Sequence, residues 1–195
     1  GMALTADGSA LRPLLEKPLV GGTPNTILFH EFDLATKSYT GTRWPYAFEQ
    51  GGAAIGDFIL FEPNRGLVIE RDNSQGSLTG LKRIFETRFP ADGGAVAKGL
   101  VVDLVAIADP NGISLPALPG DVGLGDPFAF PFVTIEDVLV LSPTEILVVN
   151  DNNFPFSIGR HVGSGAPDDE EFIRIGLDAP LGTHTPSPVV GDIDG

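Results

Sequence analysis

The sequence predicts an all-β fold built from repeated antiparallel meanders. Glycine and proline are frequent, with 25 Gly and 17 Pro in 195 residues, and only 8% of the residues are aromatic. This composition favours many turns and short strands over long helices. In addition, a pattern of two apolar strands joined by a tight turn recurs along the chain, and such a repeat is the main sequence signature of a modular β architecture.

Three stretches carry the repeat, and each contains an apolar strand, a turn with Pro or Asp-Gly, a second apolar strand and then acidic or amide side chains. They are residues 2–17, 55–74 and 135–154. The last two align closely, with Pro63 and Pro143 in equivalent turns. A further strand is expected after each pair, at residues 25–34, 80–89 and 170–177.

An antiparallel meander repeated around an axis is typical of a β-propeller. We expect residues 1–180 to form about three blades, and therefore part of a propeller ring. A β-sandwich is the alternative, because it accounts for the strands, although it gives no reason for the repeat. Residues 181–195 contain a Thr-Pro-Ser-Pro segment and are expected to form a linker or tail.

The charge of the chain limits its partners. Its formal net charge is -14, so bare nucleic acid and anionic membranes would be repelled. No apolar run approaches the roughly 18 residues that cross a bilayer, and residues 2–8 lack the features of a signal peptide. We therefore expect no nucleic acid and no membrane as partners. A phosphorylated ligand remains compatible with this charge if bound divalent cations reverse its local sign.

Three motifs occur in order along residues 2 to about 180. They are Leu14-Leu15-Glu16 after an MALTADG hairpin, Ala54–Phe58 followed by Leu67–Asp72, and Phe130–Glu136 followed by Asn150–Asn153. In this order they resemble the later part of the phytase-like β-propeller domain, a family often called "esterase-like activity of phytase". The resemblance implies a secreted or periplasmic propeller with a hydrolytic role, sometimes joined to phosphatase or phosphodiesterase domains.

Acidic and amide side chains at the strand ends of the repeats are candidate cation ligands. Calcium binds six to eight such hard oxygen atoms, and in a propeller the ends of the inner strands converge. The candidate calcium ligands are Glu16, Glu70, Asp72, Glu136, Asp137, Asp151, Asn152 and Asn153. Arg71 and Arg160 are the candidate phosphate partners, because a guanidinium can bind two oxygens at once. The alternative is structural, since Asn and Asp at strand ends also stabilise turns.

Other catalytic signatures are weak. His30, His161 and His184 lie far apart in the sequence, without the spacing of a zinc site, and are expected to be surface or loop residues. The chain contains neither cysteine nor a G-x-S-x-G motif, which excludes a cysteine nucleophile and the nucleophile elbow of α/β-hydrolases. The sequence assigns no catalytic residue.

Two functional hypotheses follow from different classes of protein. The first is a calcium-dependent hydrolase of phosphoesters or esters, acting on a phosphorylated or ester small molecule. The second is a non-catalytic propeller that serves as a binding or scaffolding module beside another enzyme domain, because this fold supports many functions. A partial ring would also expose sheet edges and apolar faces, so we expect a homodimer or association with the missing half of the propeller.

Overall fold

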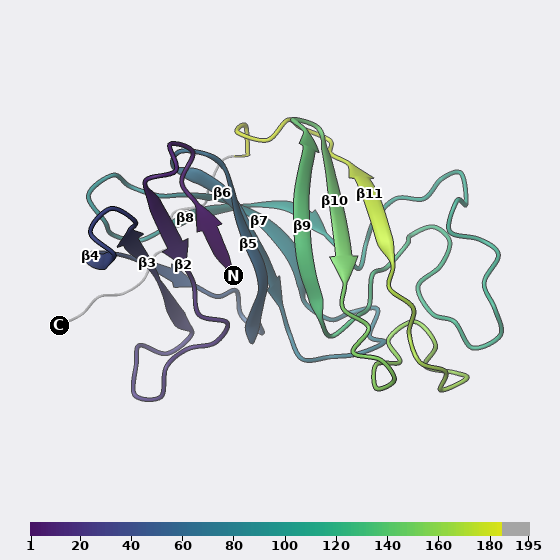
Figure 1. Ribbon diagram of the computed structural model, residues 1–195. Coiled ribbons are helices and arrows are strands. Elements are labelled where there is room, and N and C mark those ends of the chain that lie inside the picture. The colour runs from purple at the N-terminus through teal and green to yellow at the C-terminus, as the bar shows by residue number, and fades with distance from the viewer. Residues whose placement is uncertain (185–195) are drawn as a thin grey trace.

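The computed structural model of the chain describes residues 1–184. This part of the chain folds into eleven β-strands and contains no helix, which confirms the predicted all-β class. Accordingly, no helix in these residues is long and apolar enough to cross a membrane. Figure 1 shows the strands gathered into three sheets that follow one another in chain order.

Each sheet is an antiparallel meander. The first has the order β1-β2-β3-β4, formed by Met2–Leu4, Ala10–Pro13, Thr26–Asp33 and Ser38–Ala47. The second has the order β5-β6-β7-β8, formed by Ala54–Glu62, Arg65–Arg71, Lys82–Arg88 and Ala97–Asp103. The third has the order β9-β10-β11, formed by Ile135–Ser142, Glu145–Asn150 and Phe172–Gly176. The three predicted repeats therefore correspond to the three sheets.

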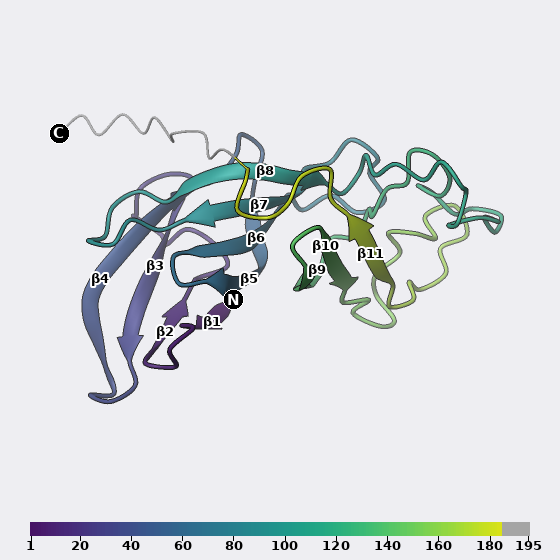
Figure 2. The ribbon, with the colours of Figure 1, turned by 90° about the horizontal axis from the view of Figure 1, so that it is seen from above.

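The first strands of the three meanders lie next to one another. β5 contacts both β1 and β9, and the remaining strands of each sheet extend away from this line (Figure 2). This is the arrangement of successive blades whose innermost strands line an axis, as expected for a partial propeller. Because the sheets also pack face to face, the arrangement is compatible with the alternative of a sandwich.

Two strands, β4 and β8, were not expected from the sequence. Both are the outermost strands of their sheets, and each pairs with a single neighbour. β4 carries Pro45 and several polar residues, while β8 contains Gly99, so neither shows a clean apolar alternation. Proline is tolerated in β4 because an edge strand does not need every backbone N–H for pairing.

The core consists of two apolar layers, one on each face of the second sheet. The layer toward the first sheet is aromatic, and the ring of Phe29 lies 4.7 Å from that of Phe58 between ring centroids. The layer toward the third sheet contains Leu67 and Ile69 of β6 together with Ile146. β6 is thus buried on both faces, with alternate residues facing opposite layers.

The long connection from 109 to 132 returns to the core at its end. Phe130 and Phe132 are buried in the layer between the second and third sheets, where their rings meet edge to face at 4.8 Å. The loop is therefore anchored at this end, while its middle lies at the end of the molecule beyond β11 (Figures 1 and 2).

The beginning of the predicted tail packs against the sheets. Leu181 N donates to Pro143 O, and Gly182 N donates to the buried carboxylate of Glu86 at 2.8 Å. Arg65 in turn donates to Gly182 O at 2.7 Å. The remainder of the predicted tail, residues 185–195, lies outside the described residues.

Gly56 marks the closest approach of the second and third sheets. A Cβ atom added at Gly56 would lie 1.8 Å from the carbonyl oxygen of Ile135, at the start of β9. Close by, the carboxylate of Asp57 accepts a hydrogen bond from Val138 N at 3.2 Å. Only glycine allows this contact between the two inner strands, and the contact aligns their first residues.

We predict that Gly56→Ala separates β5 from β9 and lowers the free energy of unfolding by at least about 2 kcal/mol, as expected for overpacking against rigid backbone. Gly176→Ala is the matched control, because a Cβ at this strand glycine meets nothing within 4 Å, and its effect should stay within about 0.5 kcal/mol. Urea unfolding of the two variants measures the difference. Equal effects would contradict this role of Gly56.

Candidate functional site

An acidic cluster lies at the starts of the inner strands β5 and β9. We call it the acidic pole and define it by Glu16, Arg71, Glu136, Asp137 and Asp151. The second sheet brings the first two together, since Ile55 N donates to Glu16 O and Ala53 N donates to Arg71 O. Arg71 also donates to the Glu16 carboxylate at 3.0 Å.

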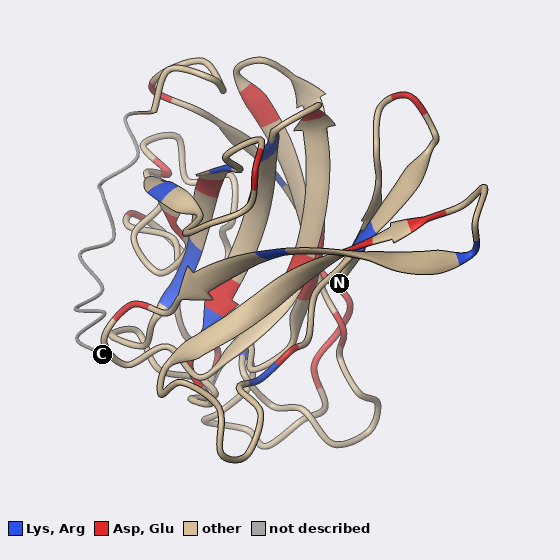
Figure 3. Cartoon of the chain, turned by 90° about the vertical axis from the view of Figure 1, so that its left-hand side faces the viewer, with Lys and Arg blue, Asp and Glu red and all other residues tan. Residues whose placement is uncertain are grey.

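The third sheet supplies the other members of the acidic pole. Glu136 and Asp137 begin β9, and Asp137 lies opposite Val149 of β10. Asp151 follows the end of β10, and its backbone N–H donates to Thr134 O at 3.0 Å, so it returns to the start of β9. Figure 3 shows acidic segments from several parts of the chain close to the N-terminus.

The carboxylates of the acidic pole repel one another. Partial burial raises the pKa of Glu136, and the negative charges of Asp151, Glu16 and Asp137 raise it further, while Arg71 opposes them. Burial also raises the pKa of Asp57, with Asp137 adding to the effect. Ionisation at this place is therefore unfavourable, and an additional positive charge would relieve it.

Two cations pair with Glu16 at the acidic pole, the exposed Lys17 at 3.7 Å and the buried Arg71, and the hydrogen bonding of Arg71 is incomplete. Its side chain is 6% exposed and forms the ion pair with Glu16. Its Nε is buried and has no hydrogen-bond partner among residues 1–184. A buried unpaired donor costs free energy, so this atom could be satisfied by an oxygen atom of a bound ligand.

The acidic pole does not hold a ready-made metal cage. Within residues 1–184, no group of three or more Asp, Glu or His side chains is arranged to hold a metal ion. Glu16 is about half exposed, and Glu136 and Asp137 are also exposed, which leaves their carboxylates free to change rotamer. Cation binding here would therefore require these side chains to reorient.

Glu70, another of the predicted calcium ligands, lies away from the acidic pole. It faces the first sheet, as does Val68, because alternate residues of β6 face opposite layers. Its carboxylate is fully buried and accepts hydrogen bonds from Tyr46 and Lys98, each at 2.8 Å, and from Glu49 N. Glu70 thus joins the first and second sheets through a buried polar network.

Asp72 also serves the structure of the second sheet. Its carboxylate accepts hydrogen bonds from Lys82 Nζ at 2.7 Å, from the backbone and hydroxyl of Ser74, and from Leu81 N. Partial burial opposes its ionisation, but these hydrogen bonds outweigh it and lower the pKa of Asp72 to about 2. The fully buried ammonium of Lys82 depends on this partner.

Asn152 and Asn153 shape the turn after β10. The backbone N–H of Asn153 donates to the Asp151 carboxylate at 2.7 Å, and that of Phe154 donates to the Asn152 side chain at 3.0 Å. The Asn153 side chain donates to the Thr134 hydroxyl at 2.6 Å. These are the turn-stabilising contacts of the structural alternative, and they fix Asp151 beside β9.

Arg160, predicted as a phosphate partner, is a buried structural cation. It donates to both oxygens of Glu171, each at 2.8 Å, and to Ala129 O at 3.0 Å and Val122 O. Its guanidinium also lies 5.0 Å from the ring centroid of Phe128. These contacts leave little of Arg160 for a ligand, and its site lies in the loops beside β11 rather than at the acidic pole.

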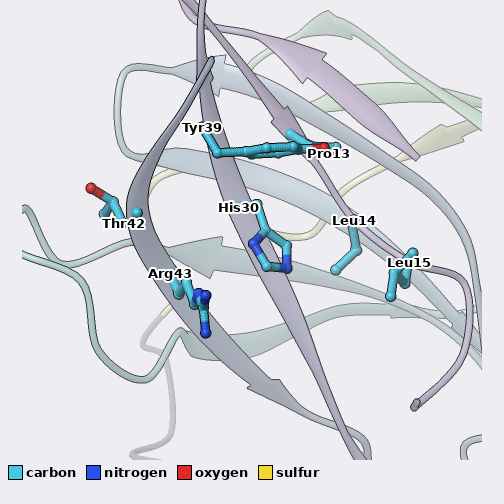
Figure 4. A pocket seen from close by; sticks show the side chains of 8 residues that line it. Pro13, Leu14, Leu15, His30, Tyr39, Thr42 and Arg43 are labelled. Carbon is cyan, nitrogen blue, oxygen red and sulfur yellow. The ribbon is translucent and has the colours of Figure 1, made fainter. Parts of the chain in front are cut away.

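A hollow of about 420 Å³ lies on the outer face of the first sheet. His30 and Arg43 line it together with Tyr39, and no acidic residue is among the described residues around it. Figure 4 shows the imidazole of His30 between Arg43 on one side and Leu14 on the other. This hollow lacks an oriented catalytic group, because no side chain within residues 1–184 forms a hydrogen bond with the imidazole of His30.

A second cleft, of about 660 Å³, lies between the loops beside β11. His161 lines it, and its Nδ1 lies 2.6 Å from the carboxylate of Asp121. The sequence assigned His161 no role beyond that of a surface or loop residue, because its partner lies 40 positions earlier in a Pro- and Gly-rich loop. No short sequence motif indicates such a pair.

Comparison with known proteins assigns the family. The family model described as "Phytase-like: Esterase-like activity of phytase" matches residues 1–154. The chain belongs to this phytase-like family. Searches of curated proteins and of solved structures found no match. All members of the acidic pole fall inside the phytase-like region, whereas Arg160 and His161 fall beyond it.

We predict that Asp72→Asn destabilises this phytase-like domain by about 3 kcal/mol at neutral pH, because it leaves the buried charge of Lys82 without its counter-ion. The pKa of Asp72 falls from 3.8 to about 2 on folding. Its contribution is therefore present above pH 4 and is lost as the pH falls toward 2. Urea unfolding of wild type and variant at several pH values should show the difference shrinking on acidification. The exposed Asp92→Asn is the control, and a pH-independent difference would contradict the assignment.

Proposed function

We propose that this phytase-like domain binds a phosphorylated or ester small molecule at the acidic pole with the help of calcium, and hydrolyses its phosphoester or ester bond. One observation carries the proposal. The carboxylates of Glu16, Glu136, Asp137 and Asp151 influence one another across the starts of two inner strands, and the cations that form ion pairs with them, Arg71 and Lys17, pair only with Glu16 within residues 1–184.

The residues of the acidic pole suit calcium by their chemistry. All four acidic members offer hard carboxylate oxygens, which calcium prefers, and the exposed ones can reorient around an ion. Calcium bound there would supply the positive charge that an anionic phosphate needs in a chain of net charge -14. The raised pKa of Glu136 supports this fit, since it reports an excess of negative charge.

The chain's own groups have separate roles in this proposal. Arg71 would bind and orient the phosphate through the guanidinium that its ion pair with Glu16 holds at the acidic pole. Glu136 is the group best suited to hold a proton, because its pKa is raised above that of an ordinary glutamate. Asp151 and Asp137 would provide the neighbouring negative charge that a bound calcium ion offsets.

The second candidate is a non-catalytic binding or scaffolding module beside another enzyme domain. The observation that favours it is that no three acidic or histidine side chains within residues 1–184 are preassembled around a metal position. A binding module can take up a cation and a phosphate without positioning an attacking water. Family membership supports a secreted or periplasmic location for either candidate.

We predict that calcium raises the thermal midpoint by a stabilisation of about 2.7 kcal/mol at a concentration about 100 times its dissociation constant. Calorimetry with calcium and with a chelator measures the shift. Glu136→Gln should raise the midpoint in chelator, because the raised pKa of Glu136 makes its ionised form unfavourable at neutral pH. The same variant should weaken the response to calcium.

A control variant and a hydrolysis assay complete this test. Asp92→Asn removes one negative charge away from the acidic pole and should respond to calcium as the wild type does. An unchanged midpoint of the wild type in millimolar calcium would refute the calcium site. Hydrolysis of 4-nitrophenyl phosphate that disappears with chelator and with Asp151→Asn would identify a hydrolase, whereas calcium binding without hydrolysis would identify a binding module.

We further propose that two copies of the chain associate through their outer sheet faces. Leu139 and Leu141 of the third sheet are 55% and 42% exposed on the face opposite the core. Apolar burial at about 25 cal/mol per Å² favours covering such a face, and the edge of β11 pairs with no described strand beyond it.

Size-exclusion chromatography with light scattering tests the association. We expect a species of twice the 20.5 kDa chain mass, which dissociates when Leu139 and Leu141 are replaced by Ser because the variant removes the apolar contact. A wild-type mass equal to that of one chain, at concentrations used for the calorimetry, would refute the proposal.

A further inference from the structure

The cleft beside β11 has the size and composition of a small-molecule site. Its volume of about 660 Å³ lies in the usual range for ligand pockets of roughly 300 to 1,000 Å³. Apolar side chains form much of its wall, including the exposed Ile113 and Leu118 from one loop and Phe172 from β11. Figures 1 and 2 show its loops at the end of the molecule opposite β4. None of its lining residues belongs to the acidic pole.

His161 and Asp121 form an oriented pair at this cleft. The Asp121 carboxylate lies 2.6 Å from His161 Nδ1 and also accepts Leu118 N at 2.9 Å. The hydrogen bond from His161, followed by that from Leu118, lowers the pKa of Asp121, so the carboxylate stays ionised. Of the two neutral tautomers, an ionised acceptor beside Nδ1 favours the one that carries its proton on Nδ1, and in this tautomer Nε2 has a free lone pair. This is the arrangement of a general base held by a carboxylate.

The backbone around the pair keeps it in place. Val122 N donates to Arg160 O at 2.9 Å, and Gly163 N donates to Gly120 O at 2.9 Å, so the two loops are joined on both sides of the pair. A Cβ atom at Gly120 would lie 2.6 Å from Ser164 N, and Gly120 has a φ of +97°. Glycine is therefore required there for the loops to approach.

The charges of the cleft select against anionic ligands. Its wall includes the carboxylates of Asp109, Asp121, Asp169 and Glu171, but only two guanidinium groups, those of Arg160 and Arg174. Glu171 already neutralises Arg160 through two hydrogen bonds, and Glu145 pairs with Arg174 at 2.6 Å. A phosphate would meet net negative charge, whereas an uncharged molecule with an apolar body would meet the apolar wall at no electrostatic cost.

We infer that this cleft binds an uncharged carboxylic ester and that His161, oriented by Asp121, is the general base for its hydrolysis by water. His161 Nε2 takes a proton from water as the water oxygen bonds to the ester carbonyl carbon. The carbon–oxygen bond to the alcohol group then breaks, and the imidazolium returns the proton to the departing alkoxide. The products are the carboxylic acid and the alcohol, and no metal takes part.

This site is separate from the acidic pole, where the proposed function places calcium-dependent hydrolysis of a phosphoester or ester. The family match ends at residue 154, before His161, so the pair is not a feature that family membership predicts. Calcium has no role in the step, and chelation therefore distinguishes the two sites. Failure of either proposal leaves the other standing.

The test measures the hydrolysis of 4-nitrophenyl butyrate by the full chain at neutral pH in the presence of chelator. His161→Gln and Asp121→Asn should each lower kcat by at least about 100-fold, as expected for loss of a general base or its orientation. Asp121→Asn should leave KM within about twofold, because Asp121 acts by orienting His161 and the variant keeps the shape of the cleft wall. Ile113→Ala should raise KM and leave kcat unchanged, since it removes only part of the apolar wall.

His30→Gln is the matched control, because His30 lines the other hollow and has no carboxylate partner within residues 1–184. It should hydrolyse the ester as the wild type does. Thermal unfolding of each variant shows whether the fold is kept, and the near-isosteric Asp121→Asn serves if His161→Gln fails to fold. Wild-type hydrolysis no faster than in buffer, loss of hydrolysis with chelator, or unchanged kcat in a folded Asp121→Asn would each overturn the inference.

Discussion

The contact of Gly56 with the carbonyl of Ile135 is the constraint on which the acidic pole depends. It lets β5 and β9 approach at their first residues, where a side chain would hold them apart. Glu16 and Arg71 are attached by backbone hydrogen bonds to the start of β5, and Asp151 is attached in the same way beside the start of β9. A cluster drawn from two sheets therefore exists only because the inner strands meet at a glycine. The chemistry of the pole is set by packing rather than by any local motif.

The buried polar groups explain why acidic residues with similar places in the repeats have different roles. β6 is covered on both sides, so adjacent residues enter different layers: Glu70 joins Tyr46 and Lys98 toward the first sheet, while Arg71 faces the acidic pole. A buried charge is tolerated only with a partner, and Glu70 and Lys82 each have one. At the acidic pole Glu16 pairs with Arg71 and Lys17, whereas Glu136, Asp137 and Asp151 form no ion pair within residues 1–184. That difference separates groups that hold the fold from groups available to a ligand.

The sequence allowed prediction of the features that are repeated along the chain or formed by residues close in sequence. The apolar hairpins and their turns predicted the three meanders, and their motifs indicated the family. The strands β4 and β8 were not predicted, because an outer strand with Pro45 or Gly99 needs no apolar alternation. The strand-end acids were recognised, but the division between Glu70 and Glu136 depends on which face of a sheet is covered. The partners of Arg160 and His161 could not be predicted, because the folded loops alone bring Glu171 and Asp121 next to them.

The excess negative charge of the chain divides its surface into sites of different chemistry. At the acidic pole the carboxylates converge without enough cations, so an anionic ligand requires a metal to bridge the repulsion. In the cleft beside β11, Arg160 and Arg174 are each paired with a carboxylate, so the carboxylates of the wall leave it net negative, and the rest of the wall is largely apolar. There the repulsion of anions becomes a source of selectivity for uncharged molecules. One electrostatic property thus leads to a cation requirement at one site and to its absence at the other.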